Sequence, residues 1–230
     1  MLPFIEQVSL GDEIDFSLDY GSVFIQTNTG PVPISAFRVP GYLCPSEPND
    51  HTRLSGGVET YVPISYAVCS GVWHVFDPAT RQGGQGMFAP ERYPRFRDCL
   101  DGTSNTFLLG EVKTYNPYYR DAATAGILPI PTNPQQLCSL GGSFKPDSGH
   151  TEWVDGRAHQ TAFTTTFGPN TKAICNVGGV EYDVDWTNSR EGLSTTAQTF
   201  AAVTSRSYHP GGVERHWSMA RCGSLAKRST

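Results

Sequence analysis

The chain has 230 residues, enough for one large domain or two small ones. Its 24 Gly and 17 Pro residues favour short strands joined by loops over long helices. The net charge is −5 without a long basic run, so a nucleic-acid partner, which needs clustered Lys and Arg, is not expected.

The predicted elements are mostly strands. Residues 1–8 form either the tail of a longer helix or a lone turn. Runs rich in β-branched and aromatic residues then predict strands at residues 22–27, 61–68, 72–76, 106–112, 161–167 and 199–205. Ser70-Gly71, between the second and third runs, predicts a hairpin or a bulge. A short helix is expected at residues 132–137, where Pro134 follows a capping residue. The sequence therefore predicts a single α+β domain, mainly antiparallel β, with long loops.

The six cysteines are spread singly, at Cys44, Cys69, Cys99, Cys138, Cys175 and Cys222. None lies in a C-x-x-C pair, so a structural zinc site is not expected. They are buried thiols or partners in a few disulfides, and an oxidising compartment is permitted. Cys44 precedes Pro45, which restricts it to an extended conformation, and a buried thiol or disulfide partner is favoured over a nucleophile. Because a G-x-S-x-G elbow is also missing from the sequence, a nucleophilic catalytic triad is not expected.

The segment Asp101-Gly102-Thr103-Ser104-Asn105-Thr106 predicts a turn. Gly102 would supply a positive φ, and the hydroxyl and amide side chains would satisfy backbone groups of the turn. The alternative is that these oxygens bind a small cation or a sugar.

The segment 150–159 has the residues most typical of a metal site. On a strand His150 and Glu152 would share a face, and a turn at Asp155-Gly156 would bring His159 back toward them. Two His and two carboxylates suit a transition metal, and His150, Glu152 and His159 would be the ligands of a metal hydrolase. The favoured interpretation is an ordinary hairpin with a polar outer face.

Seven segments together carry a resemblance to one family. They are Leu2-Pro3-Phe4-Ile5-Glu6-Gln7, Cys44-Pro45-Ser46-Glu47-Pro48, Ser65-Tyr66-Ala67, Gly86-Met87-Phe88, Asp101 to Thr106 with Gly110-Glu111, Glu152 to Arg157, and His209-Pro210-Gly211-Gly212-Val213. In this order they resemble the bacterial envelope family with a prepilin-type N-terminus and a C-terminal H-x9-DG motif. It is a domain of unknown function, formerly labelled a solute-binding family.

The resemblance implies a non-enzymatic structural or interaction module of the cell envelope, folded like the globular head of a pseudopilin and working with envelope proteins or a pilin-like assembly. Its motif residues would build turns and anchor loops: Asp101, Gly102, Thr103, Ser104, Asn105, Thr106, Glu111, Trp153, Asp155, Gly156, His209, Pro210, Gly211 and Gly212. It also implies that the family's N-terminal anchor helix is missing from this chain. No segment of the sequence itself is expected to span a bilayer.

The alternative is an extracytoplasmic module that binds a solute, a glycan or a divalent cation. Trp153, Trp186 and Tyr208 would stack a sugar. Asp101 or Asp155 would supply oxygen ligands to Ca²⁺, which heads of related pseudopilins can carry.

The sequence departs from the family's pattern at its C-terminal end. Ten residues after His209, where the family has Asp-Gly, the chain has Met219-Ala220. The codons ATG-GCN, read one nucleotide earlier, give xAT-GGC, which forces Gly and allows Asp before it. We therefore predict a frameshift between about Val213 and Met219, with a genuinely divergent tail as the alternative. The expected domain is 1–213, and residues 214–230 are expected to match no strand pattern and to pack poorly or be disordered.

Overall fold

The computed structural model describes residues 2–100, 102, 105–122, 126–217 and 222–226. Its helices are short: η1 Leu2–Ile5, α1 Val8–Asp12, η2 Tyr20–Ser22, η3 Ile34–Ala36, η4 Pro40–Tyr42, η5 Phe96–Asp98, η6 Pro134–Ser139 and α2 Ala158–Thr161. None of those within the described ranges is long and apolar enough to cross a membrane. The predicted helix after residue 132 is confirmed as η6, and the side chain of Asn133 caps it by accepting from the N–H of Gln135 at 2.9 Å.

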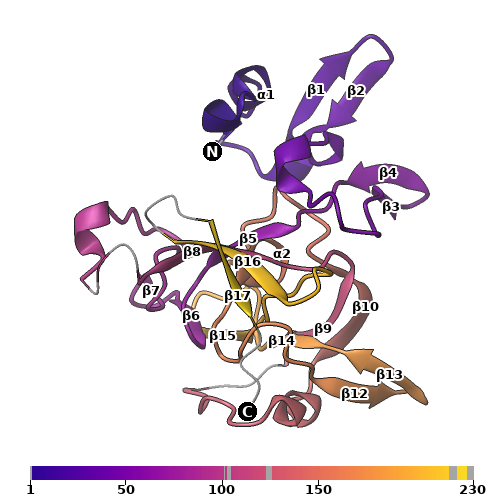
Figure 1. The fold of residues 1–230 in the computed structure, drawn as a ribbon. Coiled ribbons are helices and arrows are strands. Elements are labelled where there is room, and N and C mark those ends of the chain that lie inside the picture. The colour runs from indigo at the N-terminus through magenta and orange to yellow at the C-terminus, as the bar shows by residue number, and fades with distance from the viewer. Residues whose placement is uncertain (1, 101, 103–104, 123–125, 218–221, 227–230) are drawn as a thin grey trace.

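Two larger sheets form the body of the protein (Figure 1). The first has the order β10 (Ser143–Gly149), β9 (Asn116–Arg120), β14 (Asp185–Thr187), β15 (Thr199–Ala202), β6 (His74–Asp77) and β7 (Gln82–Gly83). The second has the order β11 (Ala162–Phe163), β5 (Tyr66–Cys69), β8 (Phe107–Glu111), β16 (Gly212–Trp217) and β17 (Cys222–Ala226). Within these sheets β11 with β5 and β14 with β9 pair in parallel, and the other described pairs are antiparallel. The predicted predominance of antiparallel β-structure is confirmed.

Three two-stranded hairpins extend from this body: β1 (Phe24–Thr27) with β2 (Gly30–Pro33), β3 (Arg53–Ser55) with β4 (Val58–Tyr61), and β12 (Ile174–Val177) with β13 (Val180–Asp183). Figure 1 shows α1 and the β1–β2 hairpin at one end of the molecule and the β12–β13 hairpin near the other.

The core lies on both faces of the six-stranded sheet. Strand β15 is buried at all four positions because its side chains alternate between two apolar clusters. Ala201 packs between the two sheets, with Ala67, Cys69 and Phe163 from the five-stranded sheet side. Its neighbours on β15 face the opposite cluster, which contains Trp73, Leu137, Ala173, Cys175, Val184, Trp186, Phe200 and Ala202.

The predicted hairpin around Ser70-Gly71 is wrong. Strand β5 pairs with β8 and β11, whereas β6 pairs with β15 and β7 in the other sheet. The chain crosses between sheets here because both residues bond to another segment: Ser70 N donates to Phe163 O at 3.0 Å, and Gly71 O accepts from Thr165 N at 2.8 Å. The predicted strand 161–167 is correspondingly short, since β11 covers only Ala162–Phe163 before the Thr side chains turn to bond backbone carbonyls.

The backbone near the C-terminal end is paired, contrary to the expectation that it matches no strand pattern. Strand β16 lies between β8 and β17, with a register irregularity between His216 and Trp217. Backbone hydrogen bonds do not depend on an apolar pattern, which is why the side-chain argument missed these strands. The side chains from residue 215 onward lie outside the described ones, so poor packing of this tail stays a prediction.

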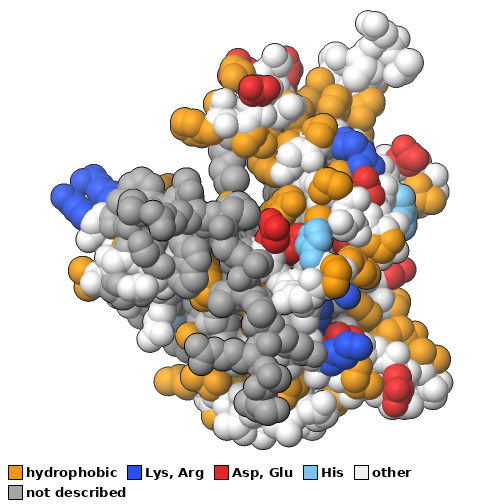
Figure 2. All heavy atoms as spheres, in the orientation of Figure 1, with side chains coloured by type: hydrophobic (Ala, Val, Ile, Leu, Met, Phe, Trp, Pro, Cys, Tyr) orange, Lys and Arg blue, Asp and Glu red, His pale blue; other side chains and the backbone are white. Residues whose placement is uncertain are grey.

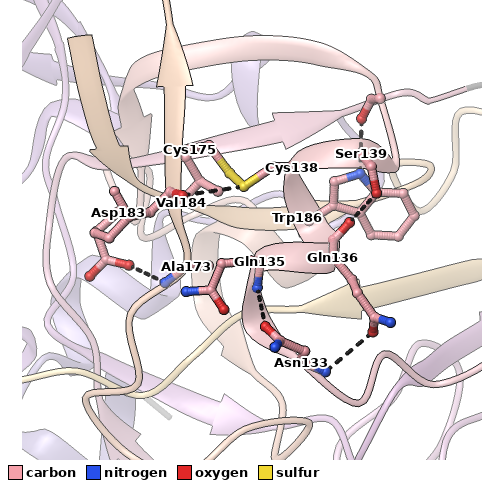
Figure 3. Close-up of a disulfide and its surroundings, with 12 residues drawn as sticks. Asn133, Gln135, Gln136, Cys138, Ser139, Ala173, Cys175, Asp183, Val184 and Trp186 are labelled. Carbon is pink, nitrogen blue, oxygen red and sulfur yellow. Dashed lines mark hydrogen bonds between the residues drawn. A yellow bond between two sulfur atoms is a disulfide. The ribbon is translucent and has the colours of Figure 1, made fainter.

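A disulfide joins Cys138 of η6 to Cys175 of β12, with the two Cα atoms 5.4 Å apart (Figure 3). The sequence left the cysteine pairing open. The bond ties a surface helix to the cluster around Trp186 and encloses a sequence separation of 37 residues.

Candidate functional site

Three segments far apart in the sequence meet at one point. Cys44 follows η4, Glu111 is the last residue of β8, and His209 lies in the loop before β16. The Sγ of Cys44 lies 3.4 Å from Nε2 of His209, and the same Nε2 lies 2.9 Å from Oε1 of Glu111. Among the described residues these three form the one group of three or more Cys, His, Asp or Glu whose ligand atoms all lie within 4.8 Å of one another. We call it the Cys44–Glu111–His209 cluster.

Glu111 holds the cluster together from the five-stranded sheet. Its side chain is 2% exposed. Its Oε2 accepts a hydrogen bond from the backbone N–H of Glu214 at 2.8 Å, which leaves Oε1 directed at His209. Its backbone carbonyl accepts from Arg206 N at 2.9 Å. The carboxylate is therefore fixed by β16 on one side and faces the His209 loop on the other.

Cys44 is a buried thiol, as the sequence predicted. Burial raises the pKa of its thiol, and the nearby Glu111 carboxylate raises it further, while the backbone N–H of Ser46 acts in the opposite direction. Burial, together with Cys44 and Glu111, also raises the pKa of Tyr66, which lies opposite Glu111 on β5. A nucleophilic cysteine has a lowered pKa, and the shift at Cys44 is in the opposite direction.

The arrangement also differs from a nucleophile–base–carboxylate relay. In such a relay the nucleophile and the carboxylate contact opposite ring nitrogens of the histidine. Here the Cys44 sulfur and the Glu111 carboxylate both approach Nε2 of His209. The sulfur of Cys44, a carboxylate oxygen of Glu111 and Nε2 of His209 thus lie close together, as the ligand atoms of a metal site do.

The surrounding motif residues anchor loops to distant backbone. Glu47, from the segment that contains Cys44, accepts from Asn49 N at 3.0 Å and from Thr114 N at 3.1 Å. Ser207 Oγ donates to Gly212 O at 2.5 Å and accepts from His209 N at 3.2 Å. The His209-Pro210-Gly211-Gly212 loop is therefore closed on itself beside the cluster.

The metal set predicted in segment 150–159 is not assembled. His150 has a positive φ of 56°, and its buried Nδ1 bonds the Gln160 carbonyl at 2.7 Å. Burial lowers the pKa of His150 to about 4 and lowers that of His159 well below its usual value. His159 stacks on Tyr118, with ring centroids 4.9 Å apart.

The two carboxylates of that set are engaged elsewhere. Glu152 pairs with Arg53 and accepts from Tyr20 Oη at 2.9 Å, and Asp155 pairs with Arg157 at 3.1 Å. The prediction assumed a strand with period-two side chains, but the segment bends and turns, so the four residues do not form one ligand set. The ligand geometry that the metal-hydrolase hypothesis needs at His150, Glu152 and His159 is therefore not formed. Both carboxylate oxygens of Asp155 are bonded to Arg157.

The other predicted motif residues have structural places. Gly102 has a φ of 88°, and its carbonyl accepts from Asn105 N at 2.9 Å and from Thr106 Oγ1 at 3.3 Å, which confirms the predicted turn. Asp101, Thr103 and Ser104 lie outside the described residues. Trp153 Nε1 donates to the Phe37 carbonyl at 2.9 Å.

One of the three aromatic residues that were predicted to stack a sugar is not accessible to a ligand. Trp186 is fully buried, with its ring stacked on Trp73 at 5.6 Å, so it cannot stack a sugar. Tyr208 instead has the ammonium of Lys113 over its ring at 4.0 Å.

Sequence reasoning chose Glu111 and His209 as loop anchors but did not place Cys44 beside them. A signal for grouping the three residues was present, because each lies in a segment that carries the family resemblance. These segments are Cys44-Pro45-Ser46-Glu47-Pro48, Gly110-Glu111 and His209-Pro210-Gly211-Gly212. What a single sequence lacks is the distance between these segments.

A family model described as a protein of unknown function (DUF1559) matches residues 1–218. No curated protein and no solved structure matches the chain. The matched region ends next to Met219, within the stretch where a frameshift is predicted, and the frameshift itself stays a prediction.

Proposed function

The chain belongs to the DUF1559 family, and we propose that it is a non-enzymatic structural or interaction module of the cell envelope, with a role like that of a pseudopilin head. The observation that carries the proposal is how its motif residues use their polar groups. Glu47, Glu111 and Trp153 bond the backbone of segments distant in the sequence. Residues used in this way stabilise a fold and its loops, and they support a function exerted through surfaces.

The disulfide supports an extracytoplasmic location. Disulfides persist in oxidising compartments and are rare in the cytosol, where thiols are kept reduced. The Cys138–Cys175 pair joins η6 to β12 beside the core. A stable bond of this kind fits a protein that works outside the reducing cytosol.

The contact surface we propose lies at the N-terminal end of the molecule. Figure 2 shows hydrophobic side chains on the surface at the top of the view, where Figure 1 has α1 and the β1–β2 hairpin. In the N-terminal segment Phe4 and Phe16 are 90% and 86% exposed. Next to them is a groove of about 490 Å³ lined by Ile5, Tyr42, Tyr66, Leu109, Trp153 and Val154. Exposed apolar surface of this kind is typical of a contact with another protein, and the proposed partner is a pilin-like envelope protein.

Fractionation of the source organism tests the location. The chain should be found in the envelope fraction, with Cys138 and Cys175 protected from a maleimide reagent until a reductant is added. Recovery in the cytosol with both cysteines modified would contradict the proposal.

Site-specific photo-cross-linking tests the partner. A photoreactive residue at Phe16 should give adducts with pilin-like envelope proteins. The matched control is Glu181, an exposed position on the β12–β13 hairpin away from the N-terminal end (Figure 1), which should give none. Equal cross-linking from both positions would argue against the proposed surface.

A second candidate function, binding of a divalent cation, is favoured by one observation. The Cys44–Glu111–His209 cluster brings three ligand-type atoms to one point.

A further inference from the structure

We propose that Cys44, Glu111 and His209 bind a single Zn²⁺ ion. This site differs from the one that the sequence suggested in segment 150–159. It does not depend on the proposed envelope role, because all three ligands come from one chain: Cys44 and Glu111 are buried and His209 is partly exposed. The inference starts from geometry: Sγ, Oε1 and Nε2 lie within 4.8 Å of one another.

The separations between ligand atoms are close to those a tetrahedral zinc ion imposes. With Zn–S near 2.3 Å and Zn–N near 2.0–2.1 Å, tetrahedral angles place sulfur and nitrogen about 3.5 Å apart and nitrogen and oxygen about 3.4 Å apart. The observed Sγ to Nε2 distance is 3.4 Å, and the Nε2 to Oε1 distance is 2.9 Å. The Glu111–His209 pair has to open by about half an ångström on this estimate. Cys44 Sγ and Glu111 Oε1, which lie within 4.8 Å of each other, have to come to about 3.6 Å.

The ligand types select the metal. Thiolate and imidazole favour zinc or another late transition metal, whereas Ca²⁺ and Mg²⁺ require shells built mainly from oxygen. Three protein ligands leave a fourth position open for water. A cavity of about 10 Å³ lined by Cys44, Glu47 and Glu111, among others, adjoins the cluster and is close to the size of one water molecule. Binding replaces the thiol proton of Cys44, which passes to solvent, by the metal, and Nε2 of His209 binds as the unprotonated ring nitrogen, with the ring proton on Nδ1.

Neighbouring groups already hold the ligands in place. The backbone N–H of Glu214 fixes Oε2 of Glu111 and leaves Oε1 for the metal. Ser207 Oγ accepts from the backbone N–H of His209 and donates to Gly212, which fixes the loop that presents the imidazole. Such outer contacts orient metal ligands and raise metal affinity.

The experiment uses the full chain without reductant, so that Cys138 and Cys175 stay bonded and contribute no thiolate. Titration with ZnCl₂ in a calorimeter should give one equivalent of bound metal. Titration with CoCl₂ should give the visible bands of a tetrahedral complex and a near-ultraviolet thiolate-to-cobalt band, both removed by Zn²⁺.

Variants locate the ion. Cys44→Ser should abolish the thiolate-to-cobalt band, and His209→Gln should weaken Zn²⁺ binding by about 100-fold or more. The matched controls are Cys99→Ser and His51→Gln, which change a cysteine and a histidine outside the cluster and should alter neither reading.

Two results would overturn the proposal: no saturable Zn²⁺ binding by the folded chain, or a thiolate-to-cobalt band that survives Cys44→Ser. If Cys44→Ser does not fold, the cobalt spectrum of the Cys99→Ser chain is the test, since absence of the band there refutes ligation by Cys44. A cytosolic location of the chain would refute the envelope proposal and leave this one intact.

Discussion

The guanidinium of Arg206 forms an ion pair with the carboxylate of Asp185 inside the protein, where the two side chains are only 3% and 4% exposed. Asp185 also accepts from Thr204 N at 3.0 Å and from Asn116 Nδ2 at 2.7 Å. Arg206 reaches Asp183 at 3.1 Å as well. The pair therefore connects β14, β9 and the segment that leads to His209.

Replacing Asp185 by Asn should lower the free energy of unfolding by about 3–5 kcal/mol, because it leaves a buried guanidinium without its main counter-charge. Urea denaturation measures the effect. The matched control is Asp50→Asn, whose partner Arg38 forms an ion pair with both side chains 41% exposed. That change should cost less than about 1 kcal/mol. Equal losses of unfolding free energy in the two variants would show that burial does not determine how much the Arg206–Asp185 pair contributes to stability.

The Cys138–Cys175 disulfide should contribute measurably to stability. The double variant Cys138→Ser/Cys175→Ser should unfold more easily by up to about 4 kcal/mol, the chain-entropy value for a loop of this size. Denaturant titration of the variant and of the oxidised parent gives the difference. Cys99→Ser, which removes a thiol outside this pair, serves as the control and should change stability little. A double variant as stable as the parent would mean that η6 is held by its packing alone.

Local signals in the sequence were enough for several elements. The capping residue before Pro134 identified η6, and β-branched runs identified β1, β8 and β15 close to their positions. The β12–β13 hairpin was missed although its turn, Gly178-Gly179, has positive φ at both positions and is a recognised hairpin signal. The strand pairings could not be predicted, because consecutive strands β5 and β6 enter different sheets.

The candidate site was predictable only in part. The family resemblance identified Glu111 and His209, but their separation along the sequence does not show how far apart they lie in the folded chain. The metal site predicted in segment 150–159 was wrong because the prediction assumed a strand, in which the His and carboxylate side chains would share a face. In the structure His150 has a left-handed φ, which is incompatible with an extended strand at that residue.

Glu191 should make stability depend on pH. Burial of its carboxyl group raises its pKa to about 7 from an ordinary 4.5, and its Oε2 is buried with no hydrogen-bond partner among the described residues. Between these values the folded state binds more protons than the unfolded one, so this contribution to stability is complete below pH 4.5 and is lost as pH rises through 7. The loss amounts to about 3 kcal/mol.

The variant Glu191→Gln isolates that contribution, because the amide stays neutral and can still accept from Ala158 N as Oε1 does. Its unfolding free energy, measured by denaturant titration from pH 4.5 to 8, should exceed that of the parent increasingly as pH rises. Burial lowers the pKa of His150 and of His159 in both proteins alike, so the pH dependence that these residues add to stability cancels in the comparison. Parallel curves for the two proteins would contradict the prediction.

Two glycines in the family's motif segments should respond oppositely to Ala. At Gly86 a Cβ would lie 2.3 Å from the Ser70 carbonyl carbon and 2.4 Å from Gly71 N, which belong to the backbone crossing between the two sheets. Because backbone cannot rotate away as a side chain can, Gly86→Ala should cost about 3 kcal/mol, the upper part of the usual range for overpacking.

At Gly156 no atom lies within 4 Å of the added Cβ, and φ is outside the left-handed region. Gly156→Ala should therefore be neutral or stabilise by up to about 1 kcal/mol, through a less flexible unfolded chain. Thermal and urea unfolding of the two variants give the comparison, and a costly Gly156→Ala would indicate that the Asp155-Gly156 segment needs a contact beyond those of the folded monomer.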